Sequence, residues 1–163
     1  MAEKFAKPCV CAVIVKTENG KEYMLMQTRQ KADGGETNGL LEIPGGKIRE
    51  YENIFTALRR EVAEETGLRV TKIHGEESAV YADAGGNTIL SFTPFCITQN
   101  LSGAYSIIVH TFLCEAEGNI AAETDEAQNI RWISVEEIRS IVQNEPENIF
   151  LMHLIALRKY LAL

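Results

Sequence analysis

The sequence predicts an α/β protein of the α+β type, in which a mixed β-sheet packs between helices. Short apolar runs typical of strands are interspersed with amphipathic helical segments, without the strict alternation of a doubly wound parallel sheet. The 163 residues, 45% of them hydrophobic and 24% charged, suit a globular domain with a sizeable core. We therefore expect a single domain spanning residues 1–163.

The first 46 residues predict three strands separated by loops. An apolar, β-branched run opens the series, and the Glu18-Asn19-Gly20 turn after it predicts a hairpin with the next run. The expected strands are CVCAVIV (9–15), YMLMQT (23–28) and LLEI (40–43), with a polar loop at 30–39 and a closing turn at Pro44-Gly45-Gly46.

A helix is predicted from Asn53 to Thr66. Phe55, Leu58 and Val62 recur at helical spacing and form one apolar stripe, and the charged residues lie elsewhere on the surface of the helix. Gly67 is the expected stop, because glycine readily adopts the left-handed conformation that ends helices.

The rest of the chain predicts further strands and two more helices. Ser134 and Glu137 have the spacing of a capping box, which marks a helix start. Strands are expected within 68–81, 88–98, 105–116 and 130–134, loops at 82–87 and 118–129, and helices near 135–143 and 147–161. An apolar stripe on the last helix (Ile149, Phe150, Leu154, Leu157 and Leu161) suits either packing on the domain's own core or a homodimer face.

Charge and cysteine content exclude some functions. The net charge of -7 argues against general affinity for nucleic acids or anionic membranes, which bind basic surfaces. The four cysteines form no C-x-x-C pair, so buried reduced thiols are expected at Cys9, Cys11, Cys96 and Cys114. An apolar signal segment is missing at the N-terminus, and no run approaches about 18 apolar residues, which predicts a cytoplasmic protein.

Three glutamates crowd the end of the first helix. Glu61, Glu64 and Glu65 point into a sector of roughly 100° on a helix of 3.6 residues per turn. A solvated acidic face, steadied by an Arg60–Glu64 pair, is the plainest interpretation. Hard cations such as Mg²⁺ prefer several carboxylate oxygens, however, and a Gly-Gly turn before the helix would let the backbone approach a metal or phosphate.

The segment GKIREYENIFTALRREVAEETGL (46–68) resembles the signature of the Nudix hydrolases. That signature is Gly, five residues, Glu, seven residues, Arg-Glu, an aliphatic residue, any residue, Glu-Glu, any residue, Gly and an aliphatic residue. Every specified position is filled, by Gly46, Glu52, Arg60, Glu61, Val62, Glu64, Glu65, Gly67 and Leu68. The order of strands and helices around it is similar to the α/β/α sandwich of this family.

The resemblance implies a role for each of these residues. Glu61, Glu64 and Glu65 would bind Mg²⁺ or Mn²⁺, with the Gly45 carbonyl as a further candidate ligand. Glu61 is also a candidate for the residue that orients or deprotonates the attacking water. Arg60 and Glu52 resemble the pair that braces the loop against the helix and orients the glutamates.

Many Nudix enzymes also use an acidic residue from a late loop, ahead of a strand with an aromatic residue. Glu126 stands six residues before Trp132 and resembles that position, with Glu123 and Asp125 as alternatives. A solvated acidic loop explains all three equally well. Arg29, Lys31 and Lys47 are candidates for holding phosphate, although surface charge is the better interpretation of each.

The activity that the resemblance implies is hydrolysis of a phosphoanhydride in a nucleoside diphosphate linked to another group. A non-catalytic nucleotide-binding module of the same fold is the alternative from a different class. An isopentenyl-diphosphate isomerase is disfavoured, because no cysteine has that enzyme's neighbouring residues. The substrate stays open among nucleoside triphosphates, including oxidised ones, ADP-ribose and other nucleotide sugars. Trp132, Tyr81 and Phe95 could stack on a base, but burial in the core is the default expectation.

Overall fold

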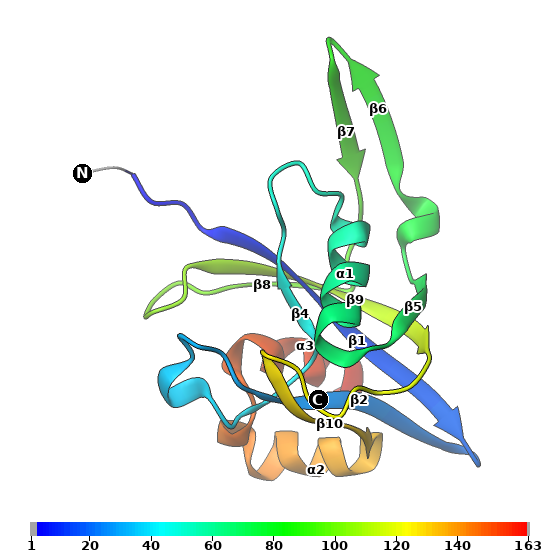
Figure 1. Cartoon of the computed structure of the whole chain (residues 1–163), viewed down its shortest axis with the longest axis vertical. Coiled ribbons are helices and arrows are strands. Elements are labelled where there is room, and N and C mark those ends of the chain that lie inside the picture. The colour runs from blue at the N-terminus through cyan, green and yellow to red at the C-terminus, as the bar shows by residue number, and fades with distance from the viewer. Residues whose placement is uncertain (1–2, 163) are drawn as a thin grey trace.

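The computed structural model describes residues 3–162 and contains one large mixed sheet (Figure 1). Five strands follow the order β10-β2-β1-β9-β5, and β3, β4 and β8 pair with β2, β1 and β9 respectively. β1 and β9 run parallel, and the other strand pairings of this sheet are antiparallel. The strands are β1 (Lys7–Glu18), β2 (Lys21–Arg29), β3 (Leu41–Glu42), β4 (Gly45–Lys47), β5 (Arg69–Ile73), β8 (Cys96–Gln99), β9 (Ile107–Glu117) and β10 (Ala127–Ser134).

Helices cover both faces of this sheet, which confirms the predicted sandwich. α1 (Ile54–Thr66) lies on one face, and α2 (Val135–Asn144) and α3 (Leu151–Leu161) lie on the other. Successive residues of a strand point to opposite faces. Val10, Ala12 and Ile14 accordingly pack in the core cluster of α1, and the intervening residues of β1 pack in the cluster of α2 and α3. Burial on both faces is the reason why this strand is an unbroken apolar run.

The sequence located α1 to within one residue. Asn53 caps the helix, since its side-chain oxygen accepts a hydrogen bond of 2.9 Å from the backbone N–H of Phe55. Gly67 ends the helix at a φ of 76°, in the left-handed region. Leu58 and Val62 are fully buried, as the apolar stripe predicts.

The prediction for residues 82–98 was wrong in two respects. Ala82–Ala84 are not loop but belong to β6 (Val80–Ala84), which pairs with β7 (Asn87–Ser91) in a two-stranded hairpin. This hairpin stands away from the rest of the molecule (Figure 1). The strand predicted over 88–98 is two strands, β7 and β8, separated around Pro94. Proline has no N–H to donate to a strand ladder, so the run is interrupted there.

The Pro44-Gly45-Gly46 segment is not the predicted turn, because Gly45 and Gly46 lie in β4 and pair with Cys11 and Val10 of β1. Gly45 has a φ of 156°, and a Cβ atom there would lie 2.2 Å from the carbonyl oxygen of Val10. Glycine is therefore required for the chain to pass this close to β1.

The last helix begins later than the sequence predicts. Pro146–Asn148 form a short 3-10 helix, and Ile149 after it is extended. The backbone N–H of Phe150 donates to the carbonyl of Leu41 at 2.8 Å, so this stretch runs beside β3. The buried residues of α3 pack on the domain's own core. None of the helices between residues 3 and 162 has the length and apolar character that a membrane crossing requires.

Candidate active site

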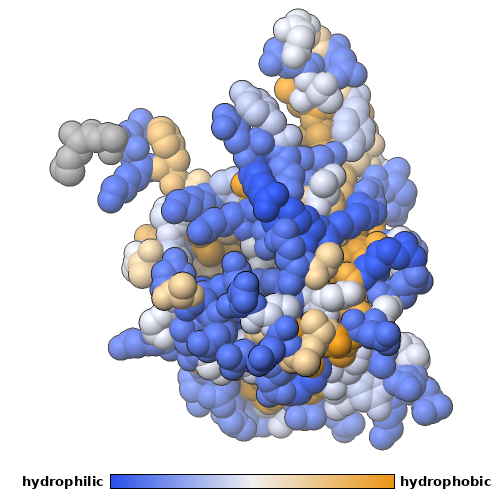
Figure 2. All heavy atoms as spheres, in the orientation of Figure 1, coloured by the Kyte–Doolittle hydropathy of each residue, from blue (hydrophilic) through white to orange (hydrophobic). Residues whose placement is uncertain are grey.

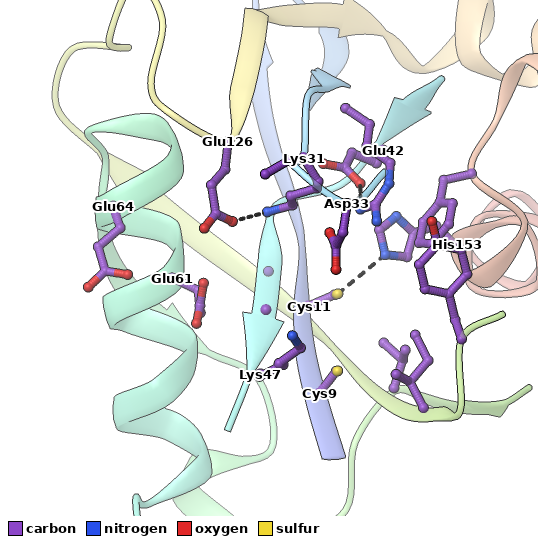
Figure 3. A pocket seen from close by; sticks show the side chains of 18 of the residues that line it. Cys9, Cys11, Lys31, Asp33, Glu42, Lys47, Glu61, Glu64, Glu126 and His153 are labelled. Atoms are coloured by element: carbon purple, nitrogen blue, oxygen red, sulfur yellow. Dashed lines mark hydrogen bonds and ion pairs between the residues drawn. The ribbon is translucent and has the colours of Figure 1, made fainter. Parts of the chain in front are cut away.

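A pocket opens where the sheet separates into two arms. β1 pairs with β4 and β9 along its first part, and with β2 only from Val15 onward. β2 diverges from this point toward β3 and β10. The resulting pocket of about 810 Å³ is lined by residues of β1, β2, β3, β4, α1 and the loops beside them (Figure 3). Hydrophilic side chains gather in front of α1 on the same side of the molecule (Figure 2).

The structure brings Glu61 and Glu64 to this pocket, and it brings all three helix glutamates to a smaller hollow beside it. Glu61, Glu64 and Glu65 line that hollow of about 450 Å³, together with Asp125 and Glu126 from the loop before β10. Glu123, the third acidic candidate of that loop, lines neither space. The acidic loop and the helix therefore face each other, although about 60 residues separate them in the chain.

Arg60 connects the glutamates to the preceding loop. Its Nε and Nη2 atoms donate to the two carboxylate oxygens of Glu52, at 2.7 and 2.8 Å. Its Nη1 atom donates to Glu61 at 2.6 Å and to Glu64 at 3.2 Å. The hydrogen bonds from Arg60 lower the pKa of Glu52 to about 2. This guanidinium thus forms the predicted contact with Glu52 and holds two glutamates of the helix at the same time.

Glu65 is the most deeply buried of the three glutamates. One of its carboxylate oxygens accepts hydrogen bonds from the Gln27 amide at 2.8 Å and from the Gly45 N–H at 2.9 Å. The other lies 2.5 Å from the ammonium nitrogen of Lys31. Burial raises the pKa of Glu65, against the opposing effect of Lys31. Burial likewise raises the pKa of Glu61, although Arg60 lowers it in part.

Lys31 lies between the helix and the acidic loop. Its ammonium group forms an ion pair with Glu65. It forms a second ion pair with Glu126, which Figure 3 shows. Burial alone would lower the pKa of Lys31, but the two carboxylates raise it above its ordinary value. The interpretation of Lys31 and Arg29 as surface charges was wrong, since their side chains are only 15% and 10% exposed.

A second buried ion pair lies on the β2–β3 side of the pocket. Arg29 donates through Nη1 to Glu42 at 3.0 Å and through Nε to Thr37 at 3.0 Å. Its guanidinium also lies 4.3 Å from the centre of the Phe150 ring, within the range of a cation–π contact. The pocket wall is therefore held in place by groups from three separate segments.

His153 lies buried at the far side of the pocket, beside Cys11 (Figure 3). Its Nδ1 atom accepts from the backbone N–H of Ile43 at 3.2 Å, so the neutral ring carries its proton on Nε2. That N–H donates to the sulfur of Cys11 at 3.3 Å. Burial lowers the pKa of His153 to about 3 and raises that of Cys11. All four cysteines are buried and free, as predicted.

The aromatic residues considered for base stacking do not lie at this pocket, and burial, the default expectation for them, is wrong for Tyr81, which is 53% exposed. Trp132, Tyr81 and Phe95 do not line the pocket, whereas Tyr105 and Phe150 do. Sequence reasoning also missed Gln27 and Glu42. The available signal was a polar residue inside a run that was otherwise predicted to be a buried strand, because such a group needs a partner. The identity of that partner is not a local property of the sequence.

The sequence model of the NUDIX domain matches residues 7–154 of this chain. The chain belongs to the Nudix hydrolase family. Among curated proteins, a 33-residue stretch is 54% identical to an 8-oxo-dGTP diphosphatase of Buchnera aphidicola. That match covers 20% of this Nudix chain and 27% of the relative, so it extends over about a quarter of the relative's length.

Solved structures show that this Nudix fold is shared over nearly the whole chain. The NUDIX domain of Shewanella oneidensis NrtR, complexed with ADP ribose, matches 98% of this chain and 89% of its own with a TM-score of 0.70 at 16% identity. A NUDIX family hydrolase from Clostridium perfringens matches 96% of this chain and 97% of its own, with a TM-score of 0.65 at 22% identity. A MutT protein from Methanosarcina mazei matches 99% and 97%, with a TM-score of 0.63 at 20% identity.

Nudix hydrolases typically depend on a divalent metal ion, and several features of this site fit such an ion. A Cβ atom on Gly46 would lie 2.3 Å from a carboxylate oxygen of Glu61, so the missing side chain leaves room for that carboxylate. The Lys31 ammonium already places a positive charge between Glu65 and Glu126. Among residues 3–162, no three acidic, histidine or cysteine side chains already form a metal cluster. Arg60 and Lys31 instead pair with these carboxylates.

Proposed function

We propose that this chain is a pyrophosphohydrolase that cleaves a phosphoanhydride bond in a nucleoside diphosphate linked to another group, with the help of Mg²⁺ or Mn²⁺. The observation that carries the proposal is the Nudix helix itself. Glu61 and Glu64 of this helix line a pocket of about 810 Å³ and accept hydrogen bonds from Arg60, which Glu52 holds in turn. The family match over residues 7–154 supports the same activity and a single domain.

The residues proposed to hold the metal are Glu61, Glu64 and Glu65, with the Gly45 carbonyl as a further ligand and Glu126 from the facing loop. Carboxylate and carbonyl oxygens are the ligands that Mg²⁺ and Mn²⁺ prefer. When bound, such an ion neutralises phosphate charge and lowers the pKa of a coordinated water. The nucleotide is the proposed small-molecule partner, and the net charge of -7 makes neutralisation of the acidic site necessary for a phosphate to approach.

The protein's own residues supply proton transfer and orientation. Glu61 is proposed to orient the attacking water and accept its proton, and a raised pKa suits a carboxylate for that role. Arg60 donates to Glu61 and is itself fixed by Glu52, so the orientation of Glu61 depends on both. Lys47 and Arg49 also line the pocket and are proposed to contact the phosphates of the substrate.

Two substrate classes have specific support. The short match to the 8-oxo-dGTP diphosphatase favours a nucleoside triphosphate, including an oxidised one. The fold shared with the ADP ribose complex favours ADP-ribose or another nucleotide sugar. A panel of these compounds, with products identified by mass spectrometry, separates the two classes. A panel without any hydrolysis in Mg²⁺ or Mn²⁺ would instead favour a binding module.

The experiment that tests the activity compares Glu64→Gln with Glu136→Gln. Glu64 lies on the Nudix helix at the pocket, whereas Glu136 is exposed in the first turn of α2. We expect Glu64→Gln to lower turnover roughly 10²–10³-fold, the loss typical of removing one group that stabilises transition-state charge. Glu136→Gln should retain turnover, and EDTA should abolish it in both the control and the unchanged protein. Near-normal turnover of Glu64→Gln at saturating Mg²⁺ would contradict the proposed metal site.

A further inference from the structure

Gln27 joins two buried carboxylates that belong to different parts of the site. It lies in β2, and its side chain has no exposed surface. Its single NH₂ group donates to Glu65 at 2.8 Å and to Glu42 at 3.2 Å. A neutral amide thus bridges one glutamate of the Nudix helix and one glutamate of β3.

Chemistry fixes the orientation of this amide. An ionised carboxylate only accepts hydrogen bonds, so the NH₂ group and not the oxygen of Gln27 must face Glu42 and Glu65. The amide oxygen consequently has no hydrogen-bond partner within residues 3–162.

Glu42 provides a fixed point for the bridge. Its second oxygen accepts from Arg29 at 3.0 Å, and Arg29 is held in turn by Thr37 and the Phe150 ring. The position of the Gln27 amide is therefore set from the β3 side of the pocket. Because the same amide donates to Glu65, the position of the Glu65 carboxylate also depends on Glu42 and Arg29.

We propose that Gln27 is a positioning residue that aims Glu65 at the divalent cation, and that it suits this role because it is neutral. The inference rests on the proposed function, since it assumes that Glu65 is a metal ligand. Gln27 and the Gly45 N–H occupy the same oxygen of Glu65, which leaves the oxygen facing Lys31 for another cation.

Neutrality distinguishes Gln27 from Arg29 and Lys31, the two charged side chains that contact these carboxylates. Arg29 neutralises Glu42, so Glu42 adds little negative charge to the metal site. A lysine or arginine at position 27 would neutralise Glu65 in the same way and weaken its attraction for a cation. A glutamate there would repel both neighbours. An amide orients Glu65 and leaves its charge intact.

The test measures Mn²⁺ binding to the protein without substrate, by titration with detection of free Mn²⁺ in electron paramagnetic resonance. Gln27→Met keeps the length of the side chain and removes the amide, and Gln27→Lys keeps a donor but adds charge. We expect both variants to bind Mn²⁺ roughly 10- to 100-fold more weakly, the loss typical of groups that orient metal ligands. Gln128→Met is the matched control, because Gln128 is exposed on the neighbouring strand β10.

A purely structural role for Gln27 predicts a different result. Gln27→Met would then lower the unfolding temperature in EDTA but leave the Mn²⁺ dissociation constant of the folded protein unchanged, and this outcome would overturn the inference. An unchanged Mn²⁺ affinity of Gln27→Lys would refute the argument that a neutral residue is needed. This second variant keeps the test decisive even if Gln27→Met does not fold. Failure of the unchanged protein to bind Mn²⁺ would instead refute the proposed function.

Discussion

The ammonium nitrogen of Lys31 lies 2.5 Å from the carboxylate of Glu65, and the same ammonium pairs with Glu126. These two ion pairs join the loop after β2, which carries Lys31, to the Nudix helix and to the acidic loop before β10. Lys31 therefore supplies a positive charge at the place where the proposed function requires a cation. The ammonium group and a metal ion would compete for the same two carboxylates.

Because of this competition, we expect Lys31→Met to lower stability without metal and to strengthen metal binding. Removing one partner of a largely buried pair leaves an uncompensated charge, so we expect the free energy of unfolding in EDTA to fall by about 3 kcal/mol. Saturating Mn²⁺ should then raise the melting temperature more in the variant than in the unchanged protein. Differential scanning calorimetry measures both quantities. Lys21→Met, at an exposed position of β2, should alter neither. A smaller Mn²⁺ effect in Lys31→Met would show that Lys31 assists metal binding.

Gly46→Ala should separate activity from stability. The new Cβ atom would lie 2.3 Å from a carboxylate oxygen of Glu61, so that flexible carboxylate has to move. We expect turnover to fall roughly 10- to 100-fold, as for other displaced site groups. Gly20→Ala should show the reverse pattern. A Cβ atom at Gly20 would meet no neighbouring atom, but the φ of 76° strains any residue other than glycine. The free energy of unfolding should therefore fall by about 1 kcal/mol, and turnover should persist. Equal turnover of both variants would contradict the assigned position of Glu61.

Glu52→Gln should change the stability of the protein in acid. Hydrogen bonds from Arg60 lower the pKa of Glu52 from 4.5 to about 2 in the folded state. The unfolded state then binds the proton more readily, so stability contributed by the ionised group is present above pH 4.5 and is lost as pH falls toward 2. Urea unfolding over this range should show a shallower dependence on pH in Glu52→Gln. An unchanged pH profile would mean that the Arg60–Glu52 contact contributes no stability in solution.

His153→Gln should change how the free energy of unfolding depends on pH between about pH 6.5 and 3. Burial lowers the pKa of His153 from 6.5 to about 3, so the folded state resists protonation that the unfolded state accepts. The free energy of unfolding should therefore fall as pH drops below 6.5, by at most about 1.4 kcal/mol per pH unit. Glutamine retains an acceptor for Ile43 and a donor for Cys11 but does not titrate. We expect urea unfolding to show that the variant has lost this dependence of the free energy of unfolding on pH. If the variant keeps it, a group other than His153 is responsible.

The sequence could predict the features of this protein that depend on neighbouring residues. Helical spacing of Phe55, Leu58 and Val62 located α1, and the Nudix signature located the glutamates and the Arg60–Glu52 contact. Alternating burial along β1 follows from strand geometry. Errors occurred where a longer-range contact decided the outcome. Gly45 and Gly46 were expected in a turn but form β4, because they pair with β1 about 35 residues earlier in the chain.

Only the tertiary structure decided which groups from distant segments hold Glu65. Lys31 and Gln27 precede Glu65 by 34 and 38 residues, and Glu126 follows it by about 60. Their contacts depend on how β2 diverges from β1 and on the strand register that brings Glu42 opposite Gln27. Side chains on one helical face meet because the helix repeats every 3.6 residues, which the sequence displays directly. Contacts between distant segments arise from packing of the whole chain, so no local pattern of residues specifies them.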